Sequence, residues 1–450
     1  MAGFKTADKS RAVWAVLLIA AGALGGVWWL VRGDEERSPG KLSRSLTVGI
    51  RNGSSTQSRQ SAAASRSEPR ALVRINLTPT PVERLQLAID GPYTVRLIET
   101  GQKIGSGRRL AQTTVEQTDG GFRIGRRRYR GTAVEIVPDV SPAIWAGDHQ
   151  YRGVVRLYSR EGGKLIAVNV LPLSDYLASV VDSEMPAAFP RAAREAQAIV
   201  ARTYALYHMA AARAHRDFDL YATTRSQNYL GYQYRDPSGR RLAGESSSSR
   251  SIVRSTAGLV CTRGGRLIPA YYSAVCGGRT TPGGEVFADA NAMRGVRCAW
   301  CRESKFYRWT AKLNRDEASQ AIRRYLSGKS LPFGRLTSLV PIAGVSGGHA
   351  AEYQVGDGGH EYRIARAAFR RKIFPTALHS LRFIARLDGD HLLFEGRGRG
   401  HGVGLCQWGA RGLALSGQSA AAIVGYYYPG TRLSRIPQRQ TRWQAKRPDE

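Results

Sequence analysis

Hydrophobic and polar residues alternate along the first half of the chain, in short runs separated by Gly and Pro turns. Alternation with a period of two is the pattern of a half-buried strand. It recurs in five runs, at 73–77, 93–99, 132–137, 154–159 and 164–171. We therefore expect a β-rich subdomain over residues 71–167.

The periodicity changes after Pro190. Residues 191–215 contain no Gly or Pro, and mostly small residues recur there at steps of three and four. A period near 3.6 behind a first-turn proline is typical of an α-helix. The pattern predicts one long helix at about 190–215, whose small residues allow close packing. Shorter helices are expected at 316–325 and 363–372.

Strand-like runs resume after residue 251, and residues 313–395 are expected to form a β-rich insertion. The predicted fold class is thus α+β: a mixed, strand-rich body over residues 71–430 that holds one long helix. Residues 33–70 are polar and poor in large apolar groups, as in a flexible linker. Residues 431–450 are rich in Lys and Arg and are expected to be a loose basic tail.

Residues 12–31 are an uncharged, mostly apolar run, long enough to cross a hydrocarbon layer of about 30 Å as a transmembrane helix. Because basic residues precede the run, residues 1–11 should be cytoplasmic and the body extracytoplasmic, in the periplasm or cell wall. We favour an uncleaved single-pass membrane anchor over a cleaved signal peptide, since the run is long and no clear cleavage site follows.

The chain is strongly basic, with 67 Lys and Arg against 35 Asp and Glu and a net charge of +32. Such a balance favours an anionic partner. Export makes nucleic acid an unsuitable one, so an acidic wall polymer or anionic lipid is the expected partner. The alternative is a bias toward Arg in codon usage with a solvated surface, since the basic residues are spread along the chain. A composition with 42% hydrophobic and 23% charged residues excludes a collagen, a disordered polyelectrolyte and a polytopic membrane protein.

Glu184 is the first candidate for chemistry. It lies between an apolar helical turn and Met185-Pro186, just before the long helix. Burial would raise the pKa of its carboxyl and a helix N-terminus would lower it. If burial dominates, Glu184 stays protonated and can act as a general acid. The alternative is a carboxylate that caps the following helix.

The second candidate is the glycine-rich segment 396–412, GRGRGHGVGLCQWGARG. So many glycines indicate positive backbone torsions or close backbone approach, as at the floor of a site. The segment lacks the Gly-Lys-Ser/Thr of a phosphate-binding loop. His401 and Gln407 are the polar groups it would present. The alternative is a tight turn with a satisfied histidine.

The two segments together resemble the SpoIID/LytB family of stage II sporulation protein D and amidase enhancers. The resemblance rests on several ordered motifs between about residues 70 and 430: DYL (175–177), EMP (184–186), AQA (196–198), ARTYAL (201–206), SQ-Y-G (226–231), AYY (270–272), the glycine-rich block and YYYPG (426–430).

The resemblance implies a peptidoglycan lytic transglycosylase, which cleaves the bond between N-acetylmuramic acid and N-acetylglucosamine and leaves a 1,6-anhydro end. Glu184 would be the catalytic acid and base. Supporting groups that orient the sugar would be Arg202, Tyr204, Gln227, His401 and Gln407. The substrate would be glycan strands stripped of their peptides, and the chemistry would need no cofactor. The enhancer branch implies an alternative, a non-catalytic wall-binding protein that assists a cell-wall amidase.

Five cysteines complete the set of candidates. Cys298 and Cys301 form a C-x-x-C motif, and Cys276 precedes a Gly-Gly turn. The resemblance implies that some family members bind zinc near this turn through Cys and His. Ser273 stands where the family often has His. Three thiolates from Cys276, Cys298 and Cys301, completed by Cys261 or a His, would suit a structural zinc. A disulfide and free thiols remain alternatives in an exported protein. Cys406 is expected to be an inert, semi-buried thiol.

Overall fold

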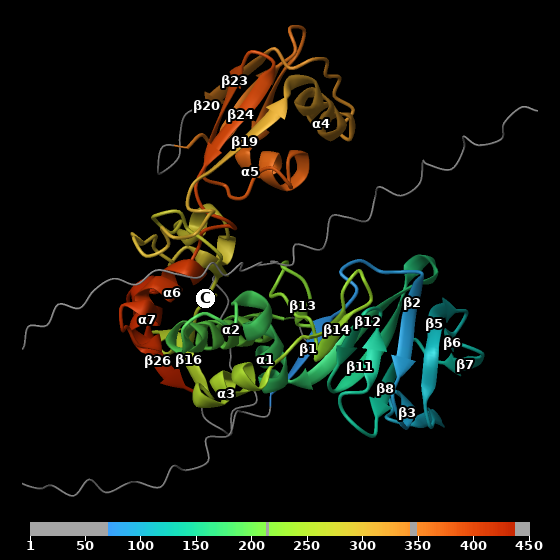
Figure 1. Cartoon of the computed structure of the whole chain (residues 1–450). Coiled ribbons are helices and arrows are strands. Elements are labelled where there is room, and N and C mark those ends of the chain that lie inside the picture. Colours follow the sequence, from blue (N-terminus) through green and yellow to red (C-terminus); the bar gives the residue numbers. More distant parts are fainter. Residues whose placement is uncertain (1–70, 213–215, 343–348, 437–450) are drawn as a thin grey trace, which may run out of the picture. The chain divides into compact units, whose positions relative to one another are not determined.

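The computed structural model describes residues 71–212, 216–342 and 349–436 (Figure 1). Within these ranges seven α-helices accompany strands that form six sheets. The α+β class is therefore confirmed. None of the helices in these ranges has the length and apolar character needed to cross a bilayer. The expected anchor at 12–31 and linker at 33–70 lie outside the described residues.

Two large sheets form the β-rich region. Their strand orders are β13-β1-β12-β11-β8-β3-β4 and β15-β14-β10-β9-β2-β5-β6-β7. The first sheet consists of β1 (Leu72–Asn76), β3 (Tyr93–Leu97), β4 (Lys103–Gly107), β8 (Ala133–Pro138), β11 (Val154–Arg160), β12 (Lys164–Pro172) and β13 (Leu220–Tyr221). The second consists of β2 (Arg84–Ile89), β5 (Leu110–Thr118), β6 (Gly121–Ile124), β7 (Arg127–Arg130), β9 (Ile144–Ala146), β10 (His149–Tyr151), β14 (Gln233–Arg235) and β15 (Arg241–Ala243).

Both sheets contribute to one core. Val73 and Ile75 of β1 and Leu87 and Ile89 of β2 are buried in the same apolar cluster. All five predicted alternating runs are strands. The strands β2 and β5 were not among the predicted runs. In β2 the residues Leu85, Leu87 and Ile89 do alternate with polar positions, whereas in β5 only Val115 is a fully buried apolar residue. Burial of alternate side chains is the main stabilising contribution of this region.

A group of helices follows the β-rich region. The helix α1 (Leu173–Glu184) begins directly after β12, and the predicted long helix is α2 (Arg191–Ala211). Around α2 pack β16 and the helices α1, α3 (Ser247–Ser255), α6 (Gln407–Leu415) and α7 (Ala420–Tyr427). Ala193 and Ala196 are wholly buried. Such small side chains allow neighbours to approach α2 on several sides (Figure 1).

Small sheets join distant parts of the chain around α2. The strand β16 (Leu259–Arg263) pairs with β17 (Arg266–Leu267) and with β26 (Arg432–Arg435), and β18 (Tyr272–Ser273) runs parallel to β25 (Leu405–Cys406). The expected tail begins too early, at residue 431, because residues 432–435 form β26 and Leu433 packs against the apolar cluster beside α2. Residues 437–450 lie outside the described ranges.

Residues 309–396 have an apolar cluster of their own. They contain β19 (Trp309–Asn314), α4 (Arg315–Ser327), β20 (Ser338–Ile342), β21 (Glu352–Gly356), β22 (Glu361–Ala365), α5 (Arg366–Ala368), β23 (Phe383–Asp388) and β24 (His391–Gly396). The helix expected at 316–325 is present as α4. The one expected at 363–372 is partly wrong, because residues 361–365 pair with β21. The helix starts at Arg366 and ends in a π-helical turn, Phe369–Ile373.

Gly404 is required where β25 meets β18. Its φ is 71°, and a Cβ there would clash with the backbone carbonyl oxygen of Tyr271. Gly417 also has a positive φ, 88°, but a Cβ there would meet no atom within 4 Å. We expect Gly417→Ala to cost about 1 kcal/mol of stability. Gly404→Ala should cost at least about 2 kcal/mol more, because the strain adds to a backbone clash. Thermal unfolding of the two variants measures the difference, and equal losses would contradict it.

Candidate active site

Glu184 ends α1, and its carboxylate is held by groups from distant parts of the chain. Met185 is extended, as expected for a residue before proline, so the helix stops at Glu184. Its Oε1 accepts a hydrogen bond from the backbone N–H of Asn228 at 2.9 Å. Its Oε2 accepts one from Nε2 of Gln407 at 3.2 Å. The two sequence motifs therefore meet at this carboxylate, as expected.

A chain of hydrogen bonds brings a third donor to Glu184. The Tyr176 hydroxyl donates to Oε1 of Gln227 at 3.1 Å, and Nε2 of Gln227 donates to the Tyr272 hydroxyl at 3.1 Å. Because the Tyr272 oxygen accepts from Gln227, its own proton is available for the hydrogen bond with Glu184. Gln227 is fully buried, so it positions Tyr272 and does not reach a substrate.

The environment of Glu184 favours its protonated form. Burial has the largest effect and raises the pKa of the carboxyl above its usual value of 4.5. Hydrogen bonds from Asn228, Gln407 and Tyr272 favour the ionised form but do not reverse this effect. A carboxyl that holds its proton toward neutral pH and has three fixed donors can give up that proton and receive one back.

His401 is neutral in this site. Its Nδ1 accepts a hydrogen bond from the backbone N–H of Val403 at 3.1 Å. Burial is the main cause that lowers its pKa from 6.5 to about 4. The ring also has a backbone hydrogen bond with Tyr272 and faces the ring of Phe287 at a centroid distance of 5.0 Å. His401 thus approaches the Glu184 environment through Tyr272.

Parallel pairing of β18 with β25 determines which side chains reach Glu184. Tyr272 pairs with Leu405, and Ser273 pairs with Cys406. Gln407 follows as the first residue of α6, so the donors from Tyr272 and Gln407 emerge from adjoining backbone segments. The site is therefore sensitive to the register of this short strand pair.

Arg202 does not occupy the substrate-binding position expected from the sequence. Its side chain is wholly inaccessible to solvent and donates to the backbone carbonyls of Val253 and Leu259. A buried guanidinium that satisfies carbonyl groups joins α2 to α3 and β16. We assign Arg202 a structural role.

Tyr204 lies near the site but is almost completely buried. Its ring lies 4.2 Å from His208 and 6.4 Å from Tyr272, centroid to centroid. Burial raises the pKa of its hydroxyl to about 12. Tyr204 therefore packs behind Tyr272 as a neutral phenol and supports its position.

Sequence reasoning missed two of the three groups that hold Glu184. Asn228 acts through its backbone N–H, which no residue-type argument can identify. Tyr272 belongs to the AYY motif, and Asn228 occupies a variable position within the SQ-Y-G motif at 226–231. Both motifs were recognised, but neither residue was assigned a role. A tyrosine directly before the expected metal-ligand position was the available signal.

Four buried cysteines form a cluster next to the Glu184 environment. The sulfur atoms of Cys276, Cys298, Cys301 and Cys406 all lie within 4.8 Å of one another. The Sγ atom of Cys406 accepts hydrogen bonds from the backbone N–H groups of Cys276 at 3.2 Å and Gly409 at 3.3 Å. Such N–H donors stabilise thiolate charge.

The fourth member of the cluster differs from the sequence expectation. Cys406 is the fourth sulfur of the cluster, in place of the expected Cys261 or histidine, and it is fully buried rather than semi-buried. Cys261 lies apart on β16, where burial raises the pKa of its thiol to about 12. Cys406 could not be placed in this cluster from the sequence, because nothing in the sequence shows that β25 pairs with β18.

Comparison with known proteins places these features in a family. The pattern of the stage II sporulation protein family matches residues 161–262, and a domain of unknown function (DUF8618) matches residues 298–404. An uncharacterized protein of Brachyspira hyodysenteriae is 30% identical over 267 residues, which cover 59% of this chain and 67% of the relative. The chain belongs to the SpoIID/LytB family.

Two further relatives carry the names of both family branches. The stage II sporulation protein D of Bacillus subtilis is 28% identical over 290 residues, 62% of this chain and 80% of that protein. The amidase enhancer of the same organism is 26% identical over 303 residues, 57% of this chain and 40% of the enhancer. The family match at 161–262 contains Glu184, Gln227 and Asn228, whereas Gln407 lies beyond both matched segments.

His401 gives this site a defined acid sensitivity. An unfolded chain takes up a proton at this imidazole near 6.5, whereas the folded chain keeps it neutral down to about 4. Because the unfolded state binds more protons between these values, stability should fall as the pH falls through the interval. The slope from one such group is at most about 1.4 kcal/mol per pH unit.

Chemical unfolding of wild type and His401→Gln at several pH values tests this expectation. The variant should lose stability less steeply than wild type as the pH falls through this interval. Parallel curves for the two proteins would show that His401 is not the group responsible.

Proposed function

We propose that this chain is a lytic transglycosylase that cleaves the bond between N-acetylmuramic acid and N-acetylglucosamine in peptidoglycan strands. The single observation that carries the proposal is the Glu184 carboxyl, which is half-buried, has a raised pKa and is oriented by three donors. The names of the Bacillus relatives and the basic character of the chain support a wall polymer as substrate.

In this mechanism protonated Glu184 donates its proton to the glycosidic oxygen as the bond to C1 of the muramic acid breaks. Positive charge develops at C1, and the primary hydroxyl on C6 of the same sugar attacks it. Glu184, now a carboxylate, accepts the hydroxyl proton, which completes the 1,6-anhydro ring and restores the acid. Intramolecular attack has a high effective concentration, so a second carboxylate to activate water is unnecessary.

The neighbouring groups have separate roles. Tyr272 and Gln407 can stabilise Glu184 as it becomes charged, because both donate to its oxygens. His401 is neutral and buried against Phe287, so it can shape the sugar site without adding charge. Gln227 positions Tyr272. In this proposal the side chains nearest the sugar are those of Glu184, Tyr272, Gln407 and His401.

The enhancer branch supports a second candidate function. One relative is named an amidase enhancer. A groove that binds glycan without cutting it could present strands to a cell-wall amidase, and it would use the same residues. The two functions differ in whether Glu184 is needed for product formation.

Because the proposed substrate, peptidoglycan, lies outside the cytoplasmic membrane, we propose that the body of the protein lies in the periplasm or cell wall. The apolar run at 12–31 would anchor the protein in the cytoplasmic membrane. An accessibility assay on intact cells, with a reporter after residue 450, tests this. A cytoplasmic signal would contradict it.

We also propose that Cys276, Cys298, Cys301 and Cys406 hold a structural zinc ion. The donor set suits it, since four thiolates from different segments can surround one tetrahedral ion. All five cysteines are free in the structure. A disulfide would join only two of four sulfurs that gather in one place. Zinc here would join the segment before Gln407 to the Gly-Gly turn and supply stability, while the proton chemistry would remain with Glu184.

Glu184→Gln should abolish anhydro-product formation. Removal of a general acid lowers rates by about 100- to 10,000-fold. Digestion of purified, peptide-free glycan strands, followed by mass analysis of the ends, measures this effect. Glu317→Gln, the same change on the exposed face of α4, is the matched control and should remain active. If wild type and Glu184→Gln both bind the strands and neither forms products, the enhancer function would be favoured.

The cleavage rate should depend on pH through the same carboxyl. Only protonated Glu184 can start the reaction, so kcat/KM should fall as the pH rises through its raised pKa. Measurement of kcat/KM across the pH range should show this fall on the alkaline side of the profile. Folding of the protein is checked at each pH. A rate that stays constant up to the alkaline limit of stability would contradict the acid role.

Purified protein should contain about one zinc ion per chain. Cys406→Ser should lower zinc content and thermal stability together, because it removes a ligand. Cys261→Ser is the matched control, since its buried thiol lies outside the cluster, and it should keep its zinc. Elemental analysis with thiol titration checks both. A disulfide or five reactive thiols in metal-free protein would disprove the zinc site.

A further inference from the structure

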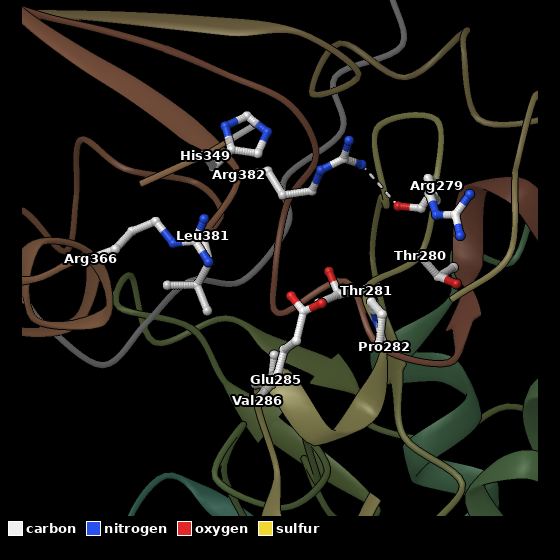
Figure 2. Close-up of a pocket in the computed structure, with 10 residues that line it drawn as sticks. All are labelled: Arg279, Thr280, Thr281, Pro282, Glu285, Val286, His349, Arg366, Leu381 and Arg382. Atoms are coloured by element: carbon white, nitrogen blue, oxygen red, sulfur yellow. Dashed lines mark hydrogen bonds between the residues drawn. The ribbon is translucent and has the colours of Figure 1, made fainter. Parts of the chain in front are cut away.

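A cavity of about 350 Å³ lies beside the glycine-rich segment, away from the hydrogen bonds around Glu184. One wall comes from residues 279–286 and the other from residues 349–382 of the 309–396 segment (Figure 2). Three of its ten lining residues are arginines, at 279, 366 and 382, and Glu285 is its one acidic lining residue. The cavity therefore carries an excess of positive charge.

The arginines differ in how firmly they are held. Arg382 donates through one terminal nitrogen to the backbone carbonyls of Cys276 at 2.8 Å and Arg279 at 2.9 Å, so it is fixed in the wall (Figure 2). The partly buried Arg366 guanidinium has no hydrogen bond to another described residue, and the one carboxylate that acts on it is Glu285, through charge alone. A partly buried guanidinium without a hydrogen-bonded carboxylate is costly unless an anion joins it.

The side chain of His349 also lines the cavity. The Nδ1 of His349 is buried and has no hydrogen-bond partner among the described residues. The ring also has a backbone hydrogen bond with Phe383, and its pKa is lowered by burial and by Arg382 and Arg366. A neutral imidazole with one free nitrogen can accept a hydrogen bond. The cavity thus offers cationic donors for an anion and an acceptor for a hydroxyl or amide N–H.

The cavity adjoins the proposed active site through its lower wall. The backbone N–H of Thr281 donates to the carbonyl of Gly402, the residue after His401, at 2.8 Å. Val286 lines the cavity, and the next residue, Phe287, packs against the His401 ring. The cavity and His401 are therefore neighbours, separated by residues 281 and 286–287.

We propose that Arg366, Arg382 and His349 form a subsite that binds a carboxylate-bearing sugar of the glycan strand, next to the sugar at Glu184. The inference rests on the proposed glycan substrate and adds the group that the strand must carry. Arg366 and Arg382 bind the carboxylate, and His349 accepts from a neighbouring hydroxyl or amide. In peptidoglycan a carboxylate comes either from the lactyl group of a peptide-free muramic acid or from the stem peptide.

Binding to defined oligosaccharides tests the subsite. The probes are a peptide-free tetrasaccharide with free lactyl carboxylates, the same compound with methylamides in their place, a peptide-bearing tetrasaccharide and chitotetraose. All are measured on full-length Glu184→Gln, so that no strand is cut. The free-acid probe should bind at least about tenfold more tightly than its methylamide, since hydrogen bonds to charged groups are strong. Chitotetraose should bind as weakly as the methylamide.

Arg366→Gln should reduce the preference for the acid to less than about threefold. Arg363→Gln is the matched control, because it removes an equal charge from an exposed position on β22 and should keep the preference. Preference for the peptide-bearing probe that depends on Arg366 would identify the stem peptide as the carboxylate source and would also support the subsite.

Two results would overturn the subsite: equal affinity for acid and methylamide with no Arg366-dependent preference for the peptide-bearing probe, or equal losses in Arg366→Gln and Arg363→Gln. The proposed cleavage fails separately, if Glu184→Gln still forms anhydro ends, and that result leaves the affinities intact.

Discussion

Withdrawal of one carboxyl from water is the constraint on which this structure depends. Glu184 ends α1 because Pro186 follows, and there it meets a backbone N–H, an amide and a phenol. Each donor alone would favour the ionised carboxylate, yet burial outweighs them and keeps the pKa raised. The result is a group that holds a proton but is already surrounded by the donors that stabilise its loss. In the proposed cleavage such preorganisation would avoid rearrangement of the site.

The surrounding architecture maintains that balance through a few short contacts. Tyr272 and Gln407 come from segments more than a hundred residues apart in the chain, joined by the two-residue parallel pair of β18 and β25. So short a pair has little stability of its own. The cysteine cluster lies at this junction, since Cys406 precedes Gln407 and Cys276 follows β18 closely. The cysteine cluster and the Glu184 carboxyl are therefore adjacent in the fold but consist of different side chains.

The sequence was informative where local pattern governs structure. Alternation identified five strands, and the 3.6 periodicity with Pro190 identified α2. Motifs identified Glu184, Gln407 and His401 as groups that come together. It was misleading where a side chain's role depends on burial: Arg202 and Gln227 look like polar binding groups but lie inside the protein. It was silent where function uses backbone, as at Asn228, or a long-range pair, as at Cys406. These depend on tertiary pairing that no single segment specifies.

The pairing of β19 with β24 places Trp309 opposite Gly396. The first and last residues of the 309–396 segment are therefore neighbours, with Cα atoms about 5 Å apart as in any antiparallel pair. A chain that leaves and returns at the same point imposes little on what precedes and follows it. The segment can thus differ in length without moving the points at which the chain enters and leaves it, although its Arg382 and His379 bond to Cys276 and Gly400 of the neighbouring segments. Sequence changes within the segment would therefore alter the cavity wall at residues 349–382 while leaving the three hydrogen bonds to Glu184 in place.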